Sequence, residues 1–205
     1  MKNPFLCVLV ISTVLFASCG GNNEATEEKP KNQLQALKEF GEKAQKMAED
    51  LENKEPVDPI DFRVLKDLLP ANASGLPLKE SSGEKNGTMG FTLSTAEATY
   101  QSEDGLSTID IDLIDAGGVS GFAMMGLAAW TFSEVDKETS TGYEKTTSIG
   151  GYKAFEKYDN SDKSGEISVL VADRFIVKVE GDGVSMEQIK KALNDIDLNT
   201  LAKAQ

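Results

Sequence analysis

The spacing of apolar residues changes along the chain, and each spacing predicts an element. Within residues 33–55, apolar side chains recur every three or four positions, which is typical of one face of a helix, and Pro56 follows. Residues 58–69 and 185–203 show the same helical spacing. Within residues 107–115, apolar and polar residues alternate instead. This alternation predicts a strand with one face in the core and one in water.

The first turns of two of these helices are recognisable. Asp58 is the predicted N-cap of the first helix of the domain, because an aspartate side chain accepts hydrogen bonds from free backbone amides. The predicted buried face of that helix consists of Ile60, Val64, Leu65, Leu68 and Leu69. Ser185 and Gln188 match a capping box at the start of the last helix.

Turn residues separate the strand-like runs and predict three hairpins. The turns fall at residues 102–105 (SEDG), 150–151 (GG) and 173–174 (DR). The predicted strands are 75–82, 91–101, 107–115, 142–149, 152–159, 166–172 and 175–181. Residues 119–132 are apolar nearly all round and too short to cross a bilayer, which favours a buried helix packed on the sheet. A helix that faces lipid or a ligand is the alternative.

This order of elements predicts the fold class. Hairpin turns are frequent and crossovers are few, so we expect an α+β domain with a mostly antiparallel sheet of about six to seven strands packed with helices. The 205 residues are 40% hydrophobic, which is enough apolar mass for one core. We therefore expect a single sandwich-like domain.

The first residues of the chain have the build of a secretory signal. Lys2 precedes an apolar run at residues 5–17, which is too short for a comfortable membrane span. We therefore expect residues 1–18 to be a signal peptide, with an uncleaved anchor helix as the alternative.

The sequence FASC at residues 16–19 resembles the lipobox of bacterial lipoproteins, in which small residues precede an invariant cysteine. The resemblance implies cleavage before Cys19, a diacylglycerol on its sulfur and a further acyl chain, such as palmitate, on its amine. Two or three acyl chains hold a protein firmly in a membrane, whereas one binds marginally. Gly20 after the cysteine resembles lipoproteins sent to the outer membrane. We therefore expect a lipid-anchored protein of the outer membrane, at its periplasmic face or at the cell surface.

The lipobox divides the chain into four parts. After the signal peptide at 1–18, residues 19–32 are polar and predict a disordered tether. Residues 33–55 form an amphipathic helix, which either packs on the domain or acts as a stalk that pairs with another chain. Residues 56–205 form the globular domain.

The domain also carries a wider resemblance. Its runs VDPIDFRVLKDLLP, GTMGFTLSTAEATY, GYEKTTSIGGYKAFEKYD and SGEISVLVADRFIVKVEG resemble a group of uncharacterised bacterial exported proteins. The order of elements is similar to the PsbP/Mog1-like fold, an α/β/α sandwich used mainly for binding and assembly. Neither resemblance implies functional residues, because a fold does not determine an activity.

Composition argues against several classes of function. The chain has no histidine, and its two cysteines are Cys7 and Cys19. Ser-His-Asp and Cys-His systems need an imidazole, and most zinc sites need Cys or His ligands. The formal net charge of −13 repels phosphate backbones, so we expect no nucleic-acid partner. We also expect no catalytic residue, cofactor or metal.

Three polar motifs invite a functional interpretation, and each has a simpler one. Asp110, Asp112 and Asp115 suggest a cation site, and the first two share a face, but a solvated strand face is favoured because calcium prefers oxygens from a folded loop. Residues 159–166 (DNSDKSGE) lack the spacing of an EF-hand and fit a hairpin loop. Ser120 in GGVSG misses the nucleophile-elbow pattern and fits a helix N-cap.

Aromatic residues gather in and just before the second hairpin. They are Trp130, Tyr143, Tyr152, Phe155 and Tyr158. If exposed together, Trp130, Tyr143, Tyr152 and Tyr158 would form a binding patch. Core packing with ordinary cross-strand pairs is the simpler interpretation.

These patterns favour a binding or scaffolding domain rather than an enzyme, with the membrane and another envelope protein as partners. Two alternatives stay open. A carboxylate-dependent hydrolase would need a cleft with paired acids and raised pKa values. A carrier of a small ligand or lipid would need an enclosed apolar cavity between the sheet and residues 119–132.

Replacing Cys19 by alanine tests the anchor. We expect Cys19→Ala protein to carry no lipid and to leave the membrane fraction, because the acyl chains attach at this sulfur. Intact-mass measurement and membrane fractionation check this outcome. Cys7→Ala protein, as the control, should stay acylated and bound; acylated, membrane-bound Cys19→Ala protein would contradict the lipobox assignment.

Overall fold

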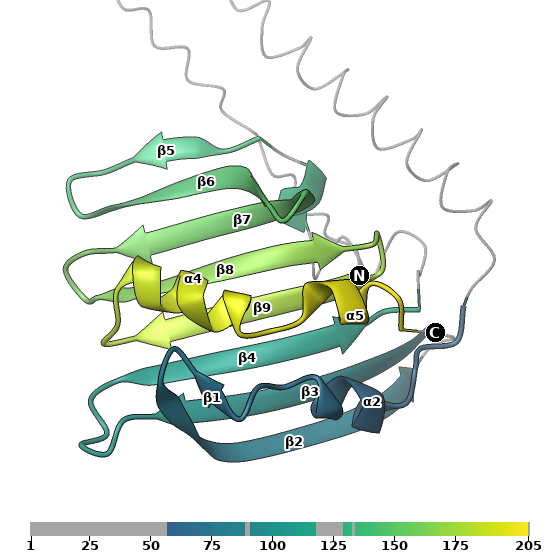
Figure 1. Cartoon of the computed structure of the whole chain (residues 1–205). Helices are drawn as coiled ribbons and strands as arrows, with labels where there is room; N and C mark the ends of the chain where they lie inside the picture. The colour runs from purple at the N-terminus through teal and green to yellow at the C-terminus, as the bar shows by residue number, and fades with distance from the viewer. Residues whose placement is uncertain (1–56, 89–90, 118–128, 133, 205) are drawn as a thin grey trace, which may run out of the picture. The chain divides into compact units, whose positions relative to one another are not determined.

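The computed structural model describes residues 57–88, 91–117, 129–132 and 134–204. In this part of the chain, nine strands form one sheet in the order β1-β2-β3-β4-β9-β8-β7-β6-β5 (Figure 1). The strands are β1 Asn72–Ala73, β2 Leu76–Thr88, β3 Phe91–Gln101, β4 Thr108–Asp115, β5 Asp136–Glu138, β6 Gly142–Ile149, β7 Tyr152–Asp159, β8 Ser164–Val171 and β9 Phe175–Asp182. Every neighbouring pair is antiparallel.

Two meanders build this sheet. Strands β1 to β4 follow one another, as do β5 to β9, and the two runs meet where β4 pairs with β9. In that pair, Ile111 lies directly opposite Val179. Strands β4 and β9 therefore form the middle of the sheet.

The mostly antiparallel, sheet-dominated class is confirmed, and so are the three predicted hairpins, β3–β4, β6–β7 and β8–β9. The predicted strand number was wrong, because nine strands are present. Strands β1 and β5 have two and three residues, too few for a periodic signal. Strand β2 continues to Thr88, well beyond the predicted 75–82. Its polar second half pairs with β3 through the backbone, and a strand at the edge of a sheet needs few buried side chains.

The first helix begins later than predicted. Helix α2 spans Phe62–Asp67, and its N-cap is Asp61 rather than Asp58. The preceding residues lie against the end of β4, where the Val57 N–H donates to the Gly117 carbonyl over 3.0 Å. This attachment commits the chain to a non-helical path until Asp61.

The predicted buried face of that helix is correct in part. Leu65 and Ile60 are buried, although Ile60 precedes the helix. Val64 is 45% exposed, which contradicts the prediction. The shorter, later helix turns Val64 away from the sheet.

The last predicted helix is two helices. Helix α4, Met186–Asn194, begins with the predicted capping box of Ser185 and Gln188. Helix α5, Leu198–Leu201, follows after a break, and Asp197 caps it by accepting the Asn199 and Thr200 amides. A new cap at this position begins a new helix with its own direction.

Several predictions concern residues outside the described part of the chain. They are the signal peptide 1–18, Cys19, the tether 19–32, the helix 33–55 and, apart from the 3-10 helix η1 Ala129–Phe132, the helix over 119–132.

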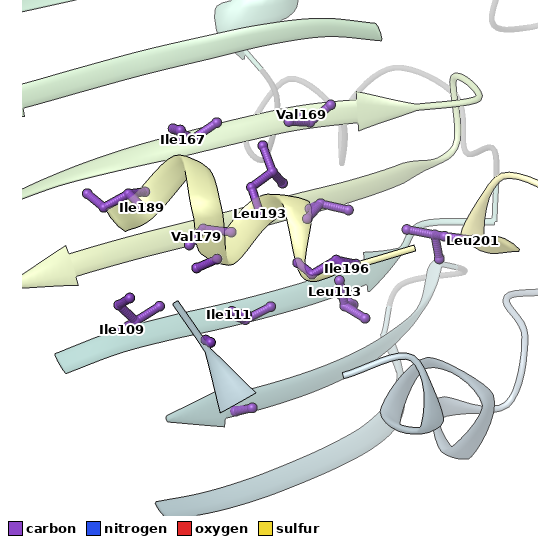
Figure 2. Close-up of a cluster of buried hydrophobic side chains, with 14 of the residues drawn as sticks. Ile109, Ile111, Leu113, Ile167, Val169, Val179, Ile189, Leu193, Ile196 and Leu201 are labelled. Atoms are coloured by element: carbon purple, nitrogen blue, oxygen red, sulfur yellow. The ribbon is translucent and has the colours of Figure 1, made fainter. Parts of the chain in front are cut away.

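One face of the sheet carries the main core. Helices α2, α4 and α5 lie on this face (Figure 1). Figure 2 shows Ile189 and Leu193 of α4 above Ile111 of β4 and Val179 of β9, all of them buried in one cluster. Burying such a side chain contributes about 1.5–3 kcal/mol, so this cluster holds the helix layer to the central strands.

Two leucines, one buried and one exposed, test this assignment of the core. Leu113 in β4 is fully buried, whereas Leu106 in the β3–β4 turn is 77% exposed. Leu113→Ala should lower the free energy of unfolding by about 2–5 kcal/mol, because it leaves a cavity. Leu106→Ala should change it by less than about 0.5 kcal/mol. Urea unfolding measures both, and equal effects would contradict the core described above.

Candidate functional site

The face of the sheet opposite α2 and α4 carries charged residues on its central strands. Residues directly opposite in an antiparallel pair share a face, and neighbours along a strand alternate. We call this side the open face; its central charged residues are Glu97 (β3), Asp110 and Asp112 (β4), Glu166 (β8) and Lys178 and Glu180 (β9). The described α-helices lie on the other face (Figure 1).

Like charges oppose each other on the open face. The directly opposite pairs are Glu97–Asp112, Asp110–Glu180 and Glu166–Glu180. Such pairs destabilise a sheet. Lys178 partly offsets the repulsion, because its Nζ lies 2.7 Å from Glu180 Oε1 and 3.9 Å from Glu166 Oε2. The patch keeps an excess of negative charge, which suits a cationic ligand.

Asp112 has a strongly raised pKa. Burial raises the pKa of its carboxyl, the charges of Glu97, Glu180 and Asp110 add to this effect, and Lys178 opposes it, so the pKa stands at about 6. Unlike an ordinary aspartate, this carboxyl takes up a proton near neutral pH. Perturbed carboxyls of this kind are typical of functional sites.

A shallow depression of about 380 Å³ lies at one end of the open face. Its lining consists of Asp110, Lys157, Asp159, Ser164, Gly165, Glu166, Glu180, Gly181 and Asp182. Carboxylates outnumber the lysine in this lining. The depression therefore continues the acidic surface of β4, β8 and β9.

The opposite end of the open face is apolar. Ala116 and Ile176 are buried there, and partly buried hydrophobic residues pack against them. The latter are Leu93, Ile114, Trp130 and Leu170. Trp130 also stacks on Phe155 of β7, with ring centroids 6.4 Å apart. The open face therefore combines a charged centre with an apolar end.

The structure does not bring the predicted aromatic patch together. Tyr143, Tyr152 and Tyr158 pack against the core on the helix-covered face, and the Tyr158 hydroxyl donates to the Val184 carbonyl over 2.9 Å. Trp130 lies at the apolar end of the open face. The four residues therefore lie on two faces, because alternation along β7 separates Tyr152 and Tyr158 from Phe155, the stacking partner of Trp130.

The aspartates of β4 are separated in the same way. Asp110 and Asp112 share the open face, as predicted, and Thr99 donates to Asp110 over 2.6 Å. Asp115 points to the other face and is buried. The described residues contain no group of three or more acidic or cysteine side chains placed to hold a metal ion.

The other two polar motifs are the run at residues 159–166 and Ser120. Of residues 159–166, those at 160–163 connect β7 to β8 and the others belong to these strands; Asp159 accepts the Ser161 N–H over 2.8 Å, as in a hairpin loop. Ser120 lies outside the described residues.

Sequence reasoning missed a buried carboxylate on the covered face. Glu156 in β7 is 2% exposed. The Tyr143 hydroxyl donates to it, and Lys145 Nζ and Lys190 Nζ lie 3.5 and 3.1 Å from its Oε1. Burial works to raise the pKa of Glu156, but these partners outweigh burial and hold the pKa below its usual value. Because Lys190 belongs to α4, this carboxylate ties α4 to β6 and β7. The sequence did contain a signal for it, because the alternation of β7 places Glu156 on the same face as the buried Ala154 and Tyr158.

Comparison of the chain with protein-family models, with curated proteins and with solved structures finds no match. Among the helices of the described residues, none has the length and apolar character needed to span a bilayer.

Replacing Asp112 by asparagine tests the cost of its ionised form. The folded pKa of about 6 exceeds the usual 3.8, so the folded state keeps the proton to higher pH than the unfolded state. This group therefore makes stability fall as pH rises from about 4 to about 6. Asparagine resembles the protonated form, and one pKa unit corresponds to about 1.4 kcal/mol, so Asp112→Asn should be more stable by up to about 3 kcal/mol at pH 7 and equal below about pH 4.

Urea unfolding at both pH values measures this difference. Asp136→Asn, at an exposed position of β5, is the control and should stay within about 0.5 kcal/mol of the parent at each pH. A less stable Asp112→Asn protein at pH 7 would show that the ionised carboxylate is favoured instead.

Proposed function

We propose that this protein is a lipid-anchored protein of the cell envelope, attached at Cys19, whose domain binds a basic segment of another envelope protein through the open face. One observation carries the binding half of this proposal. Carboxylates face carboxylates across β3, β4, β9 and β8, and Lys178 opposite Asp112 and Lys157 opposite Glu166 offset only part of this negative charge. A partner that brings lysines or arginines relieves this repulsion, so the gain is specific to a cationic partner.

The shape of the surface favours a polypeptide as the occupant. The other face of the sheet is occupied by the core and by α2, α4 and α5 (Figure 1). The charged centre of the open face extends over four neighbouring strands, β3, β4, β9 and β8. A polypeptide segment can contact several of these carboxylates along its length with its basic side chains.

The sequence supports the anchored half of the proposal. The apolar run at 5–17 and the FASC motif at 16–19 precede the predicted tether at 19–32, and the predicted helix at 33–55 then leads to the domain at 56–205. Such a tether would keep the domain near the outer membrane while leaving the open face free to meet a partner.

A carboxylate-dependent hydrolase is the second candidate. The raised pKa of Asp112 favours it, since Glu97 lies directly opposite and the two carboxyls could divide the roles of acid and base. Binding is the stronger proposal, because Glu97 is exposed, whereas the acid and base of such enzymes sit in a cleft. The carrier alternative concerns residues 119–132, of which 119–128 lie outside the described part of the chain.

A defined cationic probe tests the proposed site. Full-length protein in neutral detergent should bind a fluorescent hexalysine peptide at low salt, with affinity that falls as salt rises. The triple variant Glu97→Gln, Glu166→Gln, Glu180→Gln should bind it at least about tenfold more weakly, because it removes the opposing carboxylates.

A second triple variant separates the site from net charge. Glu103→Gln, Asp136→Asn and Glu138→Gln change the net charge by the same amount at exposed positions outside the open-face centre. This control should stay within about twofold of the parent. Equal loss in both triple variants, or no binding by the parent, would refute the open face as a site for a basic segment.

A further inference from the structure

Asp115 is a buried carboxylate with every acceptor position used. Its side chain is 0% exposed. Oδ1 accepts from Arg174 Nε at 2.9 Å and from the Gly117 N–H at 2.8 Å. Oδ2 accepts from Arg174 Nη2 at 2.7 Å and from the Ile60 N–H at 2.8 Å. A carboxylate has about four lone-pair positions, so this group is fully satisfied.

These bonds join three segments that are far apart in the sequence. Asp115 ends β4, Arg174 belongs to the β8–β9 turn, and Ile60 belongs to the first described segment of the chain. Arg174 also donates to the Asp58 carbonyl over 3.3 Å, and the Val57 N–H donates to the Gly117 carbonyl over 3.0 Å. We call the contacts of Asp115 and Arg174 with residues 57–60 the clamp.

The backbone on both sides of the clamp is tightly constrained. Gly117 has a φ of +68°, and a Cβ atom there would collide with the Val57 carbonyl oxygen. On the opposite side, Ala172 and Asp173 both have left-handed φ values, 53° and 52°, and place Arg174 directly after them. The turn therefore lies one residue earlier than predicted, and its strained backbone supports the orientation of the arginine.

The position of the clamp relates it to the preceding chain. All residues N-terminal to Val57 connect to the domain through residues 57–60. The clamp attaches this entry segment to the end of β4 and to the turn before β9. Strands β4 and β9 lie side by side in the middle of the sheet. Helix α2 comes next in the sequence and contacts the edge-side strands β2 and β3.

We propose that the clamp transfers tension from the N-terminal anchor directly to β4 and β9, so that α2 and β1 are not peeled from the sheet when the domain is pulled. This inference rests on the proposed anchoring at Cys19. Tension that enters at Val57 is borne by the bidentate pair of Arg174 and Asp115 and by the backbone hydrogen bonds of Val57 and Ile60. Helix α2 follows these residues in the sequence and is loaded only after them. The bonds to the Asp115 carboxylate are charge-assisted and therefore stronger than neutral ones, which makes this point resistant when several of them bear the load together.

Native-state hydrogen exchange on the full-length protein tests the local part of the inference. Arg174→Lys keeps the charge but loses the fork that binds both carboxylate oxygens. We expect exchange of the Val57 and Ile60 amides to accelerate at least about tenfold, while the Val177 amide in β9 keeps its rate. Arg63→Lys is the matched control, because Arg63 pairs with Asp61 in the same region but is 71% exposed; it should change none of these rates.

Single-molecule pulling tests whether the clamp resists force only when that force enters through residues 57–60. Force applied between Cys19 and a cysteine at Leu106→Cys, in protein without the lipid and with Cys7 replaced by serine, enters through the clamp. Force applied between Leu106→Cys and Lys203→Cys, with Cys7 and Cys19 replaced by serine, bypasses residues 57–60. Arg174→Lys should raise the unfolding rate at fixed force at least about tenfold in the first geometry and less than about twofold in the second.

Each outcome decides the inference. Equal acceleration of all amides, or equal weakening in both pulling geometries, would show that the pair is a general stabiliser and would overturn the proposal. Unchanged exchange at Ile60 would overturn it as well. If Arg174→Lys behaves as expected while Cys19 carries no lipid, the clamp stands and the lipid-anchoring proposal fails, so the two are distinguishable.

Discussion

The architecture depends on how one buried carboxylate is satisfied. Asp115 lies in the row of buried side chains of β4, where an ionised group is costly unless each oxygen finds donors. Arg174 and the amides of Ile60 and Gly117 supply those donors. Removing one partner of such a pair typically costs about 3–5 kcal/mol, because the other charge stays buried. The same contacts set the path of residues 57–60 and delay the start of α2, so a single ionic group decides where this helix begins.

A second buried carboxylate plays a comparable part for the helix layer. Glu156 accepts a hydrogen bond from the Tyr143 hydroxyl of β6 and forms an ion pair with Lys190 of α4. These two interactions fix how α4 lies on the sheet. Apolar contacts between α4 and the central strands provide most of the attraction, but they are not directional. The ionic contact adds direction, and its surroundings keep the pKa of Glu156 low enough for the charge to persist. Both carboxylates lie on the covered face, where each is matched by cations.

The open face has the opposite character. Its carboxylates are placed against one another, and burial and neighbouring charges leave Asp112 with a pKa of about 6. A sheet optimised for stability alone would not place like charges directly opposite. Local choices that disagree with stability are typical of surfaces kept for function. This contrast between the two faces of the same sheet is the physical basis for proposing that the open face binds a partner.

The sequence by itself determined most of the local structure. Period-two alternation and turn residues predicted the three hairpins, the capping box predicted the start of α4, and alternation placed Asp110 and Asp112 on one face, because each of these signals depends only on near neighbours. Only the tertiary structure decided the rest. The pairing of β4 with β9, the burial of Asp115 against Arg174 and the separation of Trp130 from Tyr143 depend on segments far apart in the chain. Local patterns carry no information on which distant strand lies alongside, and that choice sets which charges lie opposite a charge of the other sign and which lie opposite a like charge.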